Sequence, residues 1–265
     1  MLLPRPEGFA ADAHPYLLKG SMVRFLEGRA FRELVWIDSD CLVVGPLAAT
    51  LEAMAEDRAS GADYLAITQD SAATLGELIG RLGEEVEPFR RLVTEAGLDR
   101  GLPYLNCALF MIRSRAFLER WAAALPGLER HALFEQNLLN LLAHGSPGLV
   151  EILDRECWNV HDQDLDRLEV GEPGAMGGPA RVFLDGRGVN VIHATSYLNR
   201  SVSFRPLRVP LVGRCVEGLF RLVHNESVQK LFLRQLASFL VAHKGLLDEC
   251  GVLVELPATS PASVG

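Results

Sequence analysis

Short apolar runs alternate with longer helical patterns along this chain, and this alternation restricts the fold more than any other feature. Five runs rich in Val, Ile, Trp or Tyr predict buried strands, at 33–38, 64–68, 107–112, 149–153 and 189–193. Strands that alternate with helices favour an α/β layer structure. We therefore expect a mixed, mostly parallel sheet flanked by helices.

Apolar residues at helical spacing predict the elements between and after the strands. The predicted helices are about 16–27, 47–54, 72–97 with breaks at Gly83 and Pro88, 116–124, 133–143 and 211–247. We expect one α/β domain over residues 1–205, a C-terminal helical extension over 206–256 and a disordered tail over 257–265.

Charge and cysteine content restrict the partners and the compartment. Thirty-four acidic against 26 basic residues give a net charge of −8, which argues against nucleic-acid binding. The five cysteines are odd in number and form no Cys-x-x-Cys pair, so neither a disulfide framework nor a zinc knuckle is expected. The start MLLPRPEGF lacks a signal-peptide apolar region, and no apolar run is long enough to span a membrane. We expect a cytoplasmic protein, with peripheral membrane contact through the C-terminal helices left open.

Two carboxylates stand directly after the apolar run at 33–38. Asp38 and Asp40 are two residues apart, and residues i and i+2 of an extended chain project to the same side. In an α/β sheet, ligands collect at the carboxyl ends of strands. Two hard oxygen ligands with room for phosphates suit Mg²⁺ or Mn²⁺. The alternative is a pair of solvated turn residues before Pro46.

Other acidic residues are weaker candidates. Asp162, Asp164 and Asp166 also alternate, but no glycine or glutamate completes a calcium-loop pattern, and we expect a solvated loop there. Asp70 follows the strand predicted at 64–68 and is a candidate to line the same cleft as Asp38.

A strand that ends in Asp-x-Asp and follows a helix with a basic residue, Lys19, resembles the GT-A glycosyltransferases, and most closely glycosyltransferase family 8. Four later segments are similar to this family's motifs in the same order. They are Tyr104-Leu-Asn106-Cys-Ala-Leu-Phe-Met-Ile-Arg, Phe134-Glu135-Gln136-Asn-Leu-Leu-Asn140, Trp158-Asn159 and Val191-Ile-His193. The resemblance covers roughly residues 14–200.

The resemblance implies a GT-A-like fold and transfer of a hexose from a nucleoside-diphosphate donor, a UDP-sugar in particular, to a hydroxyl acceptor with retention of configuration. It implies metal ligation by Asp38, Asp40 and His193, and the imidazole favours Mn²⁺ over Mg²⁺. Lys19 would lie near the donor's diphosphate or sugar. Asn106, Glu135 and Gln136 would line the pocket for the donor sugar and the acceptor.

The chain also departs from the family pattern. The family's closing motif is His-x-x-Gly-x-x-Lys, whereas here Ser196 and Asn199 replace its Gly and Lys. Arg200 is the candidate to supply the diphosphate cation one position later. Asp38 comes after only 37 residues, so the base-binding segment that precedes Asp-x-Asp in the family is expected to be missing: either the start is miscalled, or the chain is a fragment, or the branch has lost this segment. We expect such a chain to be less stable and catalytically weaker than a full-length relative.

Two other functions fit part of the pattern. A phosphatase of the haloacid-dehalogenase type also places Asp-x-Asp after a strand, with the first aspartate as the nucleophile. However, Leu42 stands where its motif has Thr or Val, and a later acidic motif is missing. A non-catalytic GT-A-like domain that binds sugar or protein is the second alternative.

Overall fold

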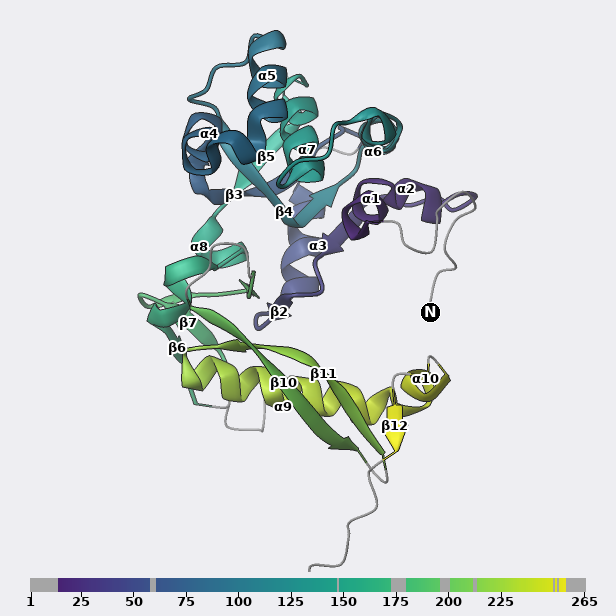
Figure 1. Ribbon diagram of the computed structural model, residues 1–265, viewed down its shortest axis with the longest axis vertical. Coiled ribbons are helices and arrows are strands. Elements are labelled where there is room, and N and C mark those ends of the chain that lie inside the picture. Colours follow the sequence, from purple (N-terminus) through teal and green to yellow (C-terminus); the bar gives the residue numbers. More distant parts are fainter. Residues whose placement is uncertain are drawn as a thin grey trace, which may run out of the picture. The chain divides into compact units, whose positions relative to one another are not determined.

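The computed structural model describes residues 14–57, 61–146, 148–172, 180–195, 201–211, 214–249, 251 and 253–255. The chain forms two compact units, and neither is continuous in sequence (Figure 1). The first comprises Met1–Cys41 and Pro46–Asn159, and the second comprises Leu42–Gly45 and Val160–Gly265.

The first unit is an α/β unit. Its elements are α1 (Pro15–Gly20), α2 (Met22–Phe25), β1 (Leu34–Ile37), α3 (Leu47–Asp57), β3 (Leu65–Thr74), α4 (Leu75–Leu82), η1 (Gly83–Val86), α5 (Glu87–Glu95), β4 (Pro103–Ile112), α6 (Arg115–Ala124), η2 (Leu125–Gly127), α7 (Phe134–His144), β5 (Val150–Leu153) and α8 (Arg155–Trp158).

The sheet of the first unit has the strand order β1-β4-β3-β5. Strand β4 lies inside the sheet and all but its first residue are buried, which explains its nearly continuous apolar sequence. It pairs antiparallel with β1 and with β3, whereas β3 and β5 are parallel. The register between β3 and β4 shifts after Ile67, where Phe110 is the partner, to Thr68, where Asn106 is the partner. Strand β4 therefore has extra residues at 107–109, and such a bulge redirects the neighbouring side chains.

Helices α6 and α7 pack beside this sheet and share its main hydrophobic core (Figure 1). Trp121 and Phe117 of α6 and Phe110 of β4 are fully buried in this core. A second cluster around Phe89 and Tyr104 joins α4 and α5 to the other end of β4. The start of α4 is capped by Thr74, whose side chain accepts a hydrogen bond from Glu77 N–H at 3.1 Å.

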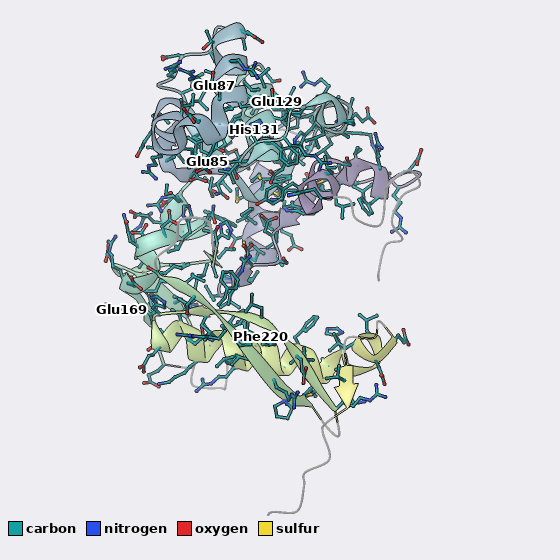
Figure 2. The ribbon with its side chains drawn as sticks, in the orientation of Figure 1. Glu85, Glu87, Glu129, His131, Glu169 and Phe220 are labelled. Carbon is teal, nitrogen blue, oxygen red and sulfur yellow. The ribbon has the colours of Figure 1, made fainter. Side chains whose placement is uncertain are left out.

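The loop that leads into α7 is attached to the neighbouring helical segments. Ala132 N–H donates to the carbonyl of Glu85 at 3.1 Å, and Arg91 pairs with Glu129 at 2.6 Å. Figure 2 shows Glu85, Glu129 and His131 at this end of the unit. These contacts hold the loop against the neighbouring helical segments before α7 begins.

The second unit is built mainly from short strands and a long hairpin. Its elements are β2 (Cys41–Val43), which starts at the last residue of the first unit, and then η3 (Asp162–Arg167), β6 (Leu168–Val170), β7 (Val182–Leu184), β8 (Arg187–Gly188), β9 (Val191–His193), β10 (Val202–Leu211), β11 (Arg214–Val223), α9 (Glu226–Ala242), α10 (Lys244–Glu249) and β12 (Leu253–Glu255).

Three small sheets form the second unit, with strand orders β2-β9, β6-β7-β8 and β10-β11-β12. The segment 42–45 joins this unit because Val44 N–H and Gly45 N–H both donate to the carbonyl of Asn190, at 2.9 and 3.1 Å. Gly45 has no room for a side chain: an added Cβ would lie 2.2 Å from Asn190 Oδ1 and 2.8 Å from Asn190 Cα. The glycine therefore permits this close approach of two backbones.

The predicted fold class, a mixed α/β structure with a sheet flanked by helices, is confirmed. The sheet of the first unit differs from the expectation in direction, because two of its three strand pairs are antiparallel. The helix predicted over 16–27 is divided at Ser21 into α1 and α2. The helix predicted from 211 is wrong up to residue 223, where β11 lies, and α9 begins at Glu226. Among the described residues, no helix is long and apolar enough to cross a membrane.

Candidate functional site

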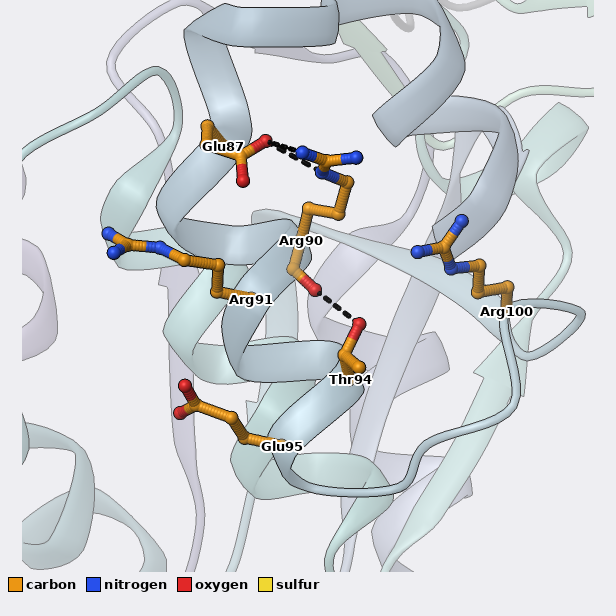
Figure 3. Close-up of a pocket in the computed structure, with 6 residues that line it drawn as sticks. All are labelled: Glu87, Arg90, Arg91, Thr94, Glu95 and Arg100. Atoms are coloured by element: carbon orange, nitrogen blue, oxygen red, sulfur yellow. Dashed lines mark hydrogen bonds and ion pairs between the residues drawn. The ribbon is translucent and has the colours of Figure 1, made fainter.

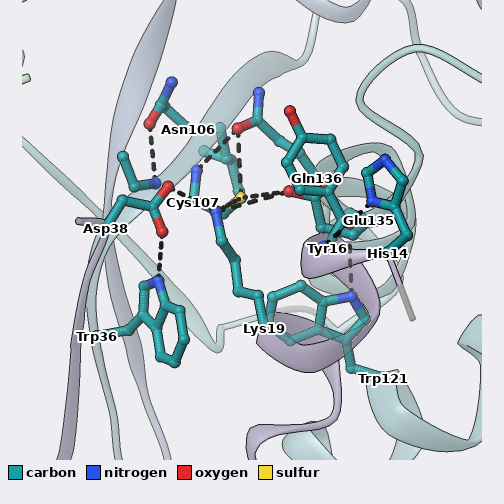
Figure 4. Close-up of polar contacts among 12 residues, drawn as sticks. His14, Tyr16, Lys19, Trp36, Asp38, Asn106, Cys107, Trp121, Glu135 and Gln136 are labelled. Carbon is teal, nitrogen blue, oxygen red and sulfur yellow. Dashed lines mark hydrogen bonds and ion pairs between the residues drawn. The ribbon is translucent and has the colours of Figure 1, made fainter. Parts of the chain in front are cut away.

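A buried lysine is the centre of the candidate site in the first unit (Figure 4). Lys19 lies on α1, and only 7% of its surface is exposed. Its Nζ donates to Asp38 Oδ2 at 2.6 Å and lies 3.6 Å from Glu135 Oε1. It also donates to Cys107 Sγ at 3.4 Å. One ammonium group is thus held between two carboxylates contributed by a strand end and a helix start.

Asp38 directly follows β1 and continues its pairing, because its N–H donates to the carbonyl of Ala108 at 2.8 Å. Both carboxylate oxygens accept hydrogen bonds: Oδ1 from Trp36 Nε1 at 2.6 Å and Oδ2 from Lys19. Trp36 and Asp38 are two residues apart on extended backbone, so both side chains project to the same side. The strand therefore supplies both the carboxylate and the indole that orients it.

Glu135 lies in the first turn of α7, where a negative charge is favoured by the helix dipole. The helix begins after Leu133, which has a left-handed backbone conformation with φ +56°. Such a conformation is strained for leucine, and strain of this kind is frequent at functional sites. Trp121 Nε1 donates to the backbone carbonyl of Glu135 at 3.1 Å. Among the described residues, Glu135 Oε2 is buried and has no hydrogen-bond partner.

A network of amides extends the site along β4. Asn106 Nδ2 donates to Asp70 Oδ2 at 2.6 Å, and its Oδ1 accepts from Ala108 N–H at 2.9 Å. Gln136 Nε2 donates to the same Asp70 oxygen at 3.2 Å, while its Oε1 accepts from Cys107 N–H at 3.1 Å. The bulge at 107–109 places these groups at a kink in β4 rather than on regular sheet.

Burial and charge shift the titration of the groups around Lys19. Burial alone would lower the pKa of Lys19, but Cys107, Asp38 and Glu135 together outweigh it, and its pKa is raised well above the ordinary value. Burial raises the pKa of Glu135, although nearby Lys19 opposes this rise. Burial and the charge of Glu135 raise the pKa of Tyr16. Lys19 therefore stays charged at neutral pH, and Glu135 is the group most easily protonated.

The structure brings together five of the predicted site residues: Lys19, Asp38, Asn106, Glu135 and Gln136. Asp70, the weaker candidate, joins them through its hydrogen bonds to both amides.

The remaining predicted residues are not part of this cluster. Asp40 lies in the turn after β1, where Cys41 N–H donates to the carbonyl of Asp38 at 3.0 Å, so the extended-chain argument for Asp38 and Asp40 does not apply. His193 is buried on β9 and belongs to the second unit. Arg200, with Ser196 and Asn199, lies outside the described residues. A metal shared by Asp38, Asp40 and His193 stays a prediction.

The acids at 162–166 differ from the solvated loop that was expected. Asp164 is 6% exposed and pairs with Arg167 at 2.8 Å, and Ser201 Oγ donates to Asp166 at 2.8 Å. Asp164 and Asp166 therefore have partners within the protein, and neither carboxylate needs a cation to explain its position.

Sequence reasoning did not single out Trp36, Cys107 and Tyr16. The spacing of Trp36 from Asp38 is a signal that could have identified the indole, because alternate residues of a strand share a face. Cys107 follows Asn106 inside a continuous apolar run, so its position at a bulge could not be read from the pattern. Tyr16 lies near the site because it precedes Lys19 by about one turn on the same helix, α1.

A separate hollow of about 250 Å³ lies on the surface of the first unit (Figure 3). It is lined by charged side chains of α5 and the following loop, and Arg90 pairs with Glu87 at 2.5 Å. None of the predicted site residues lines this hollow.

No protein-family model and no curated protein matches this chain. Three solved structures are similar. Mouse xyloside xylosyltransferase 1 is 14% identical with a TM-score of 0.40, and the match covers 69% of this chain and 64% of that one. The bifunctional glycosyltransferase WbbM is 16% identical with a TM-score of 0.39, covering 58% and 27%. The galactosyltransferase LgtC, solved with donor and acceptor sugar analogues, is 14% identical with a TM-score of 0.38, covering 75% and 62%.

The chain thus spans less than two thirds of each of these three glycosyltransferases. A likeness at these TM-scores supports no functional conclusion, and the function must be argued from the residues of the site.

Proposed function

We propose that this chain is a glycosyltransferase that moves a hexose from a nucleoside-diphosphate donor, a UDP-sugar in particular, to a hydroxyl acceptor. The observation that carries the proposal is Glu135 Oε2, a buried carboxylate oxygen without a hydrogen-bond partner among the described residues, beside the ion pair of buried Lys19 with partly exposed Asp38. Such an oxygen accepts a hydrogen bond from a hydroxyl group that enters the site.

The ionic cluster is costly for a purely structural role. Replacement of a buried ion pair by well-packed apolar residues is often neutral or stabilising, so the burial of Lys19 and Glu135, with Asp38 partly exposed beside them, does not serve stability alone. Buried charges with shifted pKa values gather at functional sites. A sugar presents several hydroxyls, each of which donates and accepts, and the carboxylates and amides here match that chemistry.

The proposed reaction is a displacement at the anomeric carbon. The bond from this carbon to the diphosphate oxygen breaks, a bond to the acceptor hydroxyl oxygen forms, and the acceptor loses its proton. Lys19 would stabilise negative charge on the donor, and Asn106, Glu135 and Gln136 would hold the sugar and the acceptor in line. Retention of configuration follows from the family resemblance alone.

Asp38, Asp40 and His193 would hold a divalent cation. The donor set of two carboxylates and an imidazole suits Mn²⁺ better than Mg²⁺. Each Asp38 oxygen keeps a second lone pair after it accepts from Trp36 or Lys19, so the hydrogen bonds do not exclude a cation. When bound, the cation would neutralise charge on the departing diphosphate. Arg200 would add a further positive charge for the diphosphate.

The alternatives differ in what they ask of Asp38. In the phosphatase interpretation Asp38 attacks phosphorus, and the sequence argues against it, because Leu42 stands where the phosphatase motif has Thr or Val. A non-catalytic sugar-binding domain would use the same side chains without turnover, and nothing in the cluster favours it over an enzyme.

The test is release of UDP from UDP-glucose and UDP-galactose with Mn²⁺, first without and then with sugar acceptors. Glu135→Gln keeps the size of the side chain and should lower the rate about 100-fold, since it removes a charged group at the reacting centre. Glu129→Gln, on an exposed carboxylate outside the cluster, is the matched control.

Binding of a UDP-sugar without any turnover would favour the non-catalytic domain. Hydrolysis of p-nitrophenyl phosphate that is lost in Asp38→Asn would favour the phosphatase. An unchanged rate in Glu135→Gln would refute the role given to the carboxylate.

A further inference from the structure

Two buried histidines lie side by side in the second unit. His161 follows Val160, which forms a parallel bridge with Ile192, and His193 follows Ile192. Val160 N–H donates to the carbonyl of Val191 at 3.1 Å, and His193 N–H donates to the carbonyl of Val160 at 2.8 Å. Neighbouring residues in such a bridge share a face, and the ring centroids of His161 and His193 are 5.8 Å apart, with an angle of 72° between the ring planes.

The imidazole of His161 is not explained by contacts within the fold. The residue is 1% exposed, and among the described residues neither ring nitrogen has a hydrogen-bond partner. Buried polar atoms are almost always paired, and an exception in a native structure indicates a missing ligand, ion or water. Nε2 of His161 is thus a buried nitrogen that has no hydrogen-bond partner among the described residues.

A carboxylate lies beside Nδ1 of the His161 ring. Asp162 Oδ2 lies 3.1 Å from His161 Nδ1. Asp162 holds this position in a left-handed backbone conformation, with φ +56°. In metal sites, a ligating histidine commonly has a carboxylate beside the ring nitrogen that does not ligate, which leaves the other nitrogen as the metal donor. This arrangement leaves Nε2 of His161 as the free donor.

We propose that His161 is a metal ligand that acts together with His193 in the second unit. The inference extends the metal set proposed above, and it rests on that proposal for the role of His193. A nitrogen ligand lies about 2.0–2.1 Å from its metal and about 1.1 Å from its own ring centroid, so two centroids that share an ion are separated by at most about 6.4 Å. The observed 5.8 Å lies within this limit.

A second imidazole changes which cation the site selects. Oxygen ligands suit Mg²⁺ and Mn²⁺, whereas imidazole nitrogen favours later first-row cations such as Co²⁺ and Zn²⁺. The pair therefore selects a nitrogen-preferring divalent cation over Mg²⁺.

The test is titration of the full-length protein with Co²⁺, followed by visible absorption and calorimetry. The wild type should bind Co²⁺, and His161→Gln should weaken binding by about 10-fold or more. His224→Gln, on an exposed histidine of the same unit, is the matched control and should leave binding unchanged. Wild-type protein that does not bind Co²⁺, or His161→Gln protein within about twofold of the wild type, would overturn the inference.

A second measurement needs no variant. In protein with ¹⁵N-labelled histidine, substoichiometric Mn²⁺ should broaden the imidazole signals of two buried rings, and a buried water in place of an ion would leave both sharp.

Failure of this inference is distinguishable from failure of the proposed function. A protein that binds Co²⁺ through His161 and turns over no nucleotide sugar refutes glycosyl transfer alone. A protein that transfers sugar, while His161→Gln changes no metal binding, refutes this inference alone.

Discussion

Replacement of Lys19 by methionine tests whether the ion cluster depends on the charge of Lys19 or packs like an ordinary hydrophobic core. The substitution keeps most of the volume of the side chain and removes its charge. Glu135, 2% exposed, and Asp38, with a side chain 21% exposed, then lose their shared ammonium. Removal of one partner of a buried ion pair costs about 3–5 kcal/mol. Because the Asp38 side chain stays partly exposed to water, we expect a loss at the lower end of this range, about 3 kcal/mol in the free energy of unfolding at pH 8.

The loss of stability in Lys19→Met should depend on pH, because protonation removes the unpaired negative charge of the buried Glu135 carboxylate. Its folded pKa is already raised by burial, and without Lys19 it rises further. Where the folded carboxyl keeps a proton that the unfolded one has lost, stability falls as pH rises. The loss in Lys19→Met should therefore be smaller at pH 5 than at pH 8. The difference is about 1.4 kcal/mol for each unit by which the substitution raises the pKa of Glu135.

The assay is urea unfolding followed by tryptophan fluorescence at pH 5 and pH 8. All three tryptophans, Trp36, Trp121 and Trp158, belong to the first unit, so the signal reports that unit alone. Arg91→Met removes an exposed ion pair with Glu129 and should cost less than about 1 kcal/mol. Adding Glu135→Gln to Lys19→Met should remove the pH dependence. A loss in Lys19→Met that is equal at both pH values would refute the reasoning.

Three further substitutions test other parts of the structure. Asp40→Ala should abolish Mn²⁺-dependent binding of a nucleotide sugar in calorimetry while the fluorescence unfolding curve stays unchanged, and an unaltered affinity would contradict the metal proposal. Asn140→Ala should cost about 2–3 kcal/mol in the same unfolding assay, because the Asn140 amide accepts from Leu105 N–H at 2.8 Å and donates to Leu105 C=O at 2.9 Å, both fully buried. A loss below about 0.5 kcal/mol would mean that these backbone groups find other partners. Gly45→Ala should destabilise the second unit by about 1–3 kcal/mol, since its Cβ would overlap Asn190. Amide hydrogen exchange should then become faster in the second unit, while the tryptophan unfolding curve of the first unit stays unchanged. Unchanged exchange would show that the backbones at residues 45 and 190 can move apart to accommodate the methyl group.

The sequence predicted the regular elements of the first unit well where the patterns were strong. The helices expected at 116–124 and 133–143 correspond closely to α6 and α7, and the strand at 107–112 lies within β4. The direction of pairing could not be predicted, because an apolar run is equally suited to a parallel or an antiparallel neighbour when both its faces are buried.

The helical extension expected over 206–256 includes most of the long hairpin of the second unit, although a signal against helix was present. Pro206 and Pro210 lie inside β10, where proline removes a backbone donor and argues against a helix interior. Strand β10 lies at the edge of its sheet, which is where a strand tolerates proline.

The candidate site was predictable in its residue types and not in its contacts. Lys19, Asp38, Asn106, Glu135 and Gln136 were identified through family motifs, and the fold gathers them in the first unit. The ion pair of Lys19 with Asp38 joins residues 19 apart, and the bulge of β4 arises from its pairing with β3, where Thr68 is the partner of Asn106; local patterns encode neither contact.

The segment 42–45 has a consequence for how the chain acquires its structure. These residues emerge from the ribosome roughly 150 residues before the strand they pair with, so the second unit closes through a contact of very long sequence separation, which is slow to form. The first unit can complete its sheet earlier, since β1, β3, β4 and β5 all precede residue 154. A cut between Asn159 and Val160 would leave β9 without β2, and neither fragment would carry a whole second unit. Expression of the two units as separate proteins would therefore require a circular permutation or a grafted copy of those four residues.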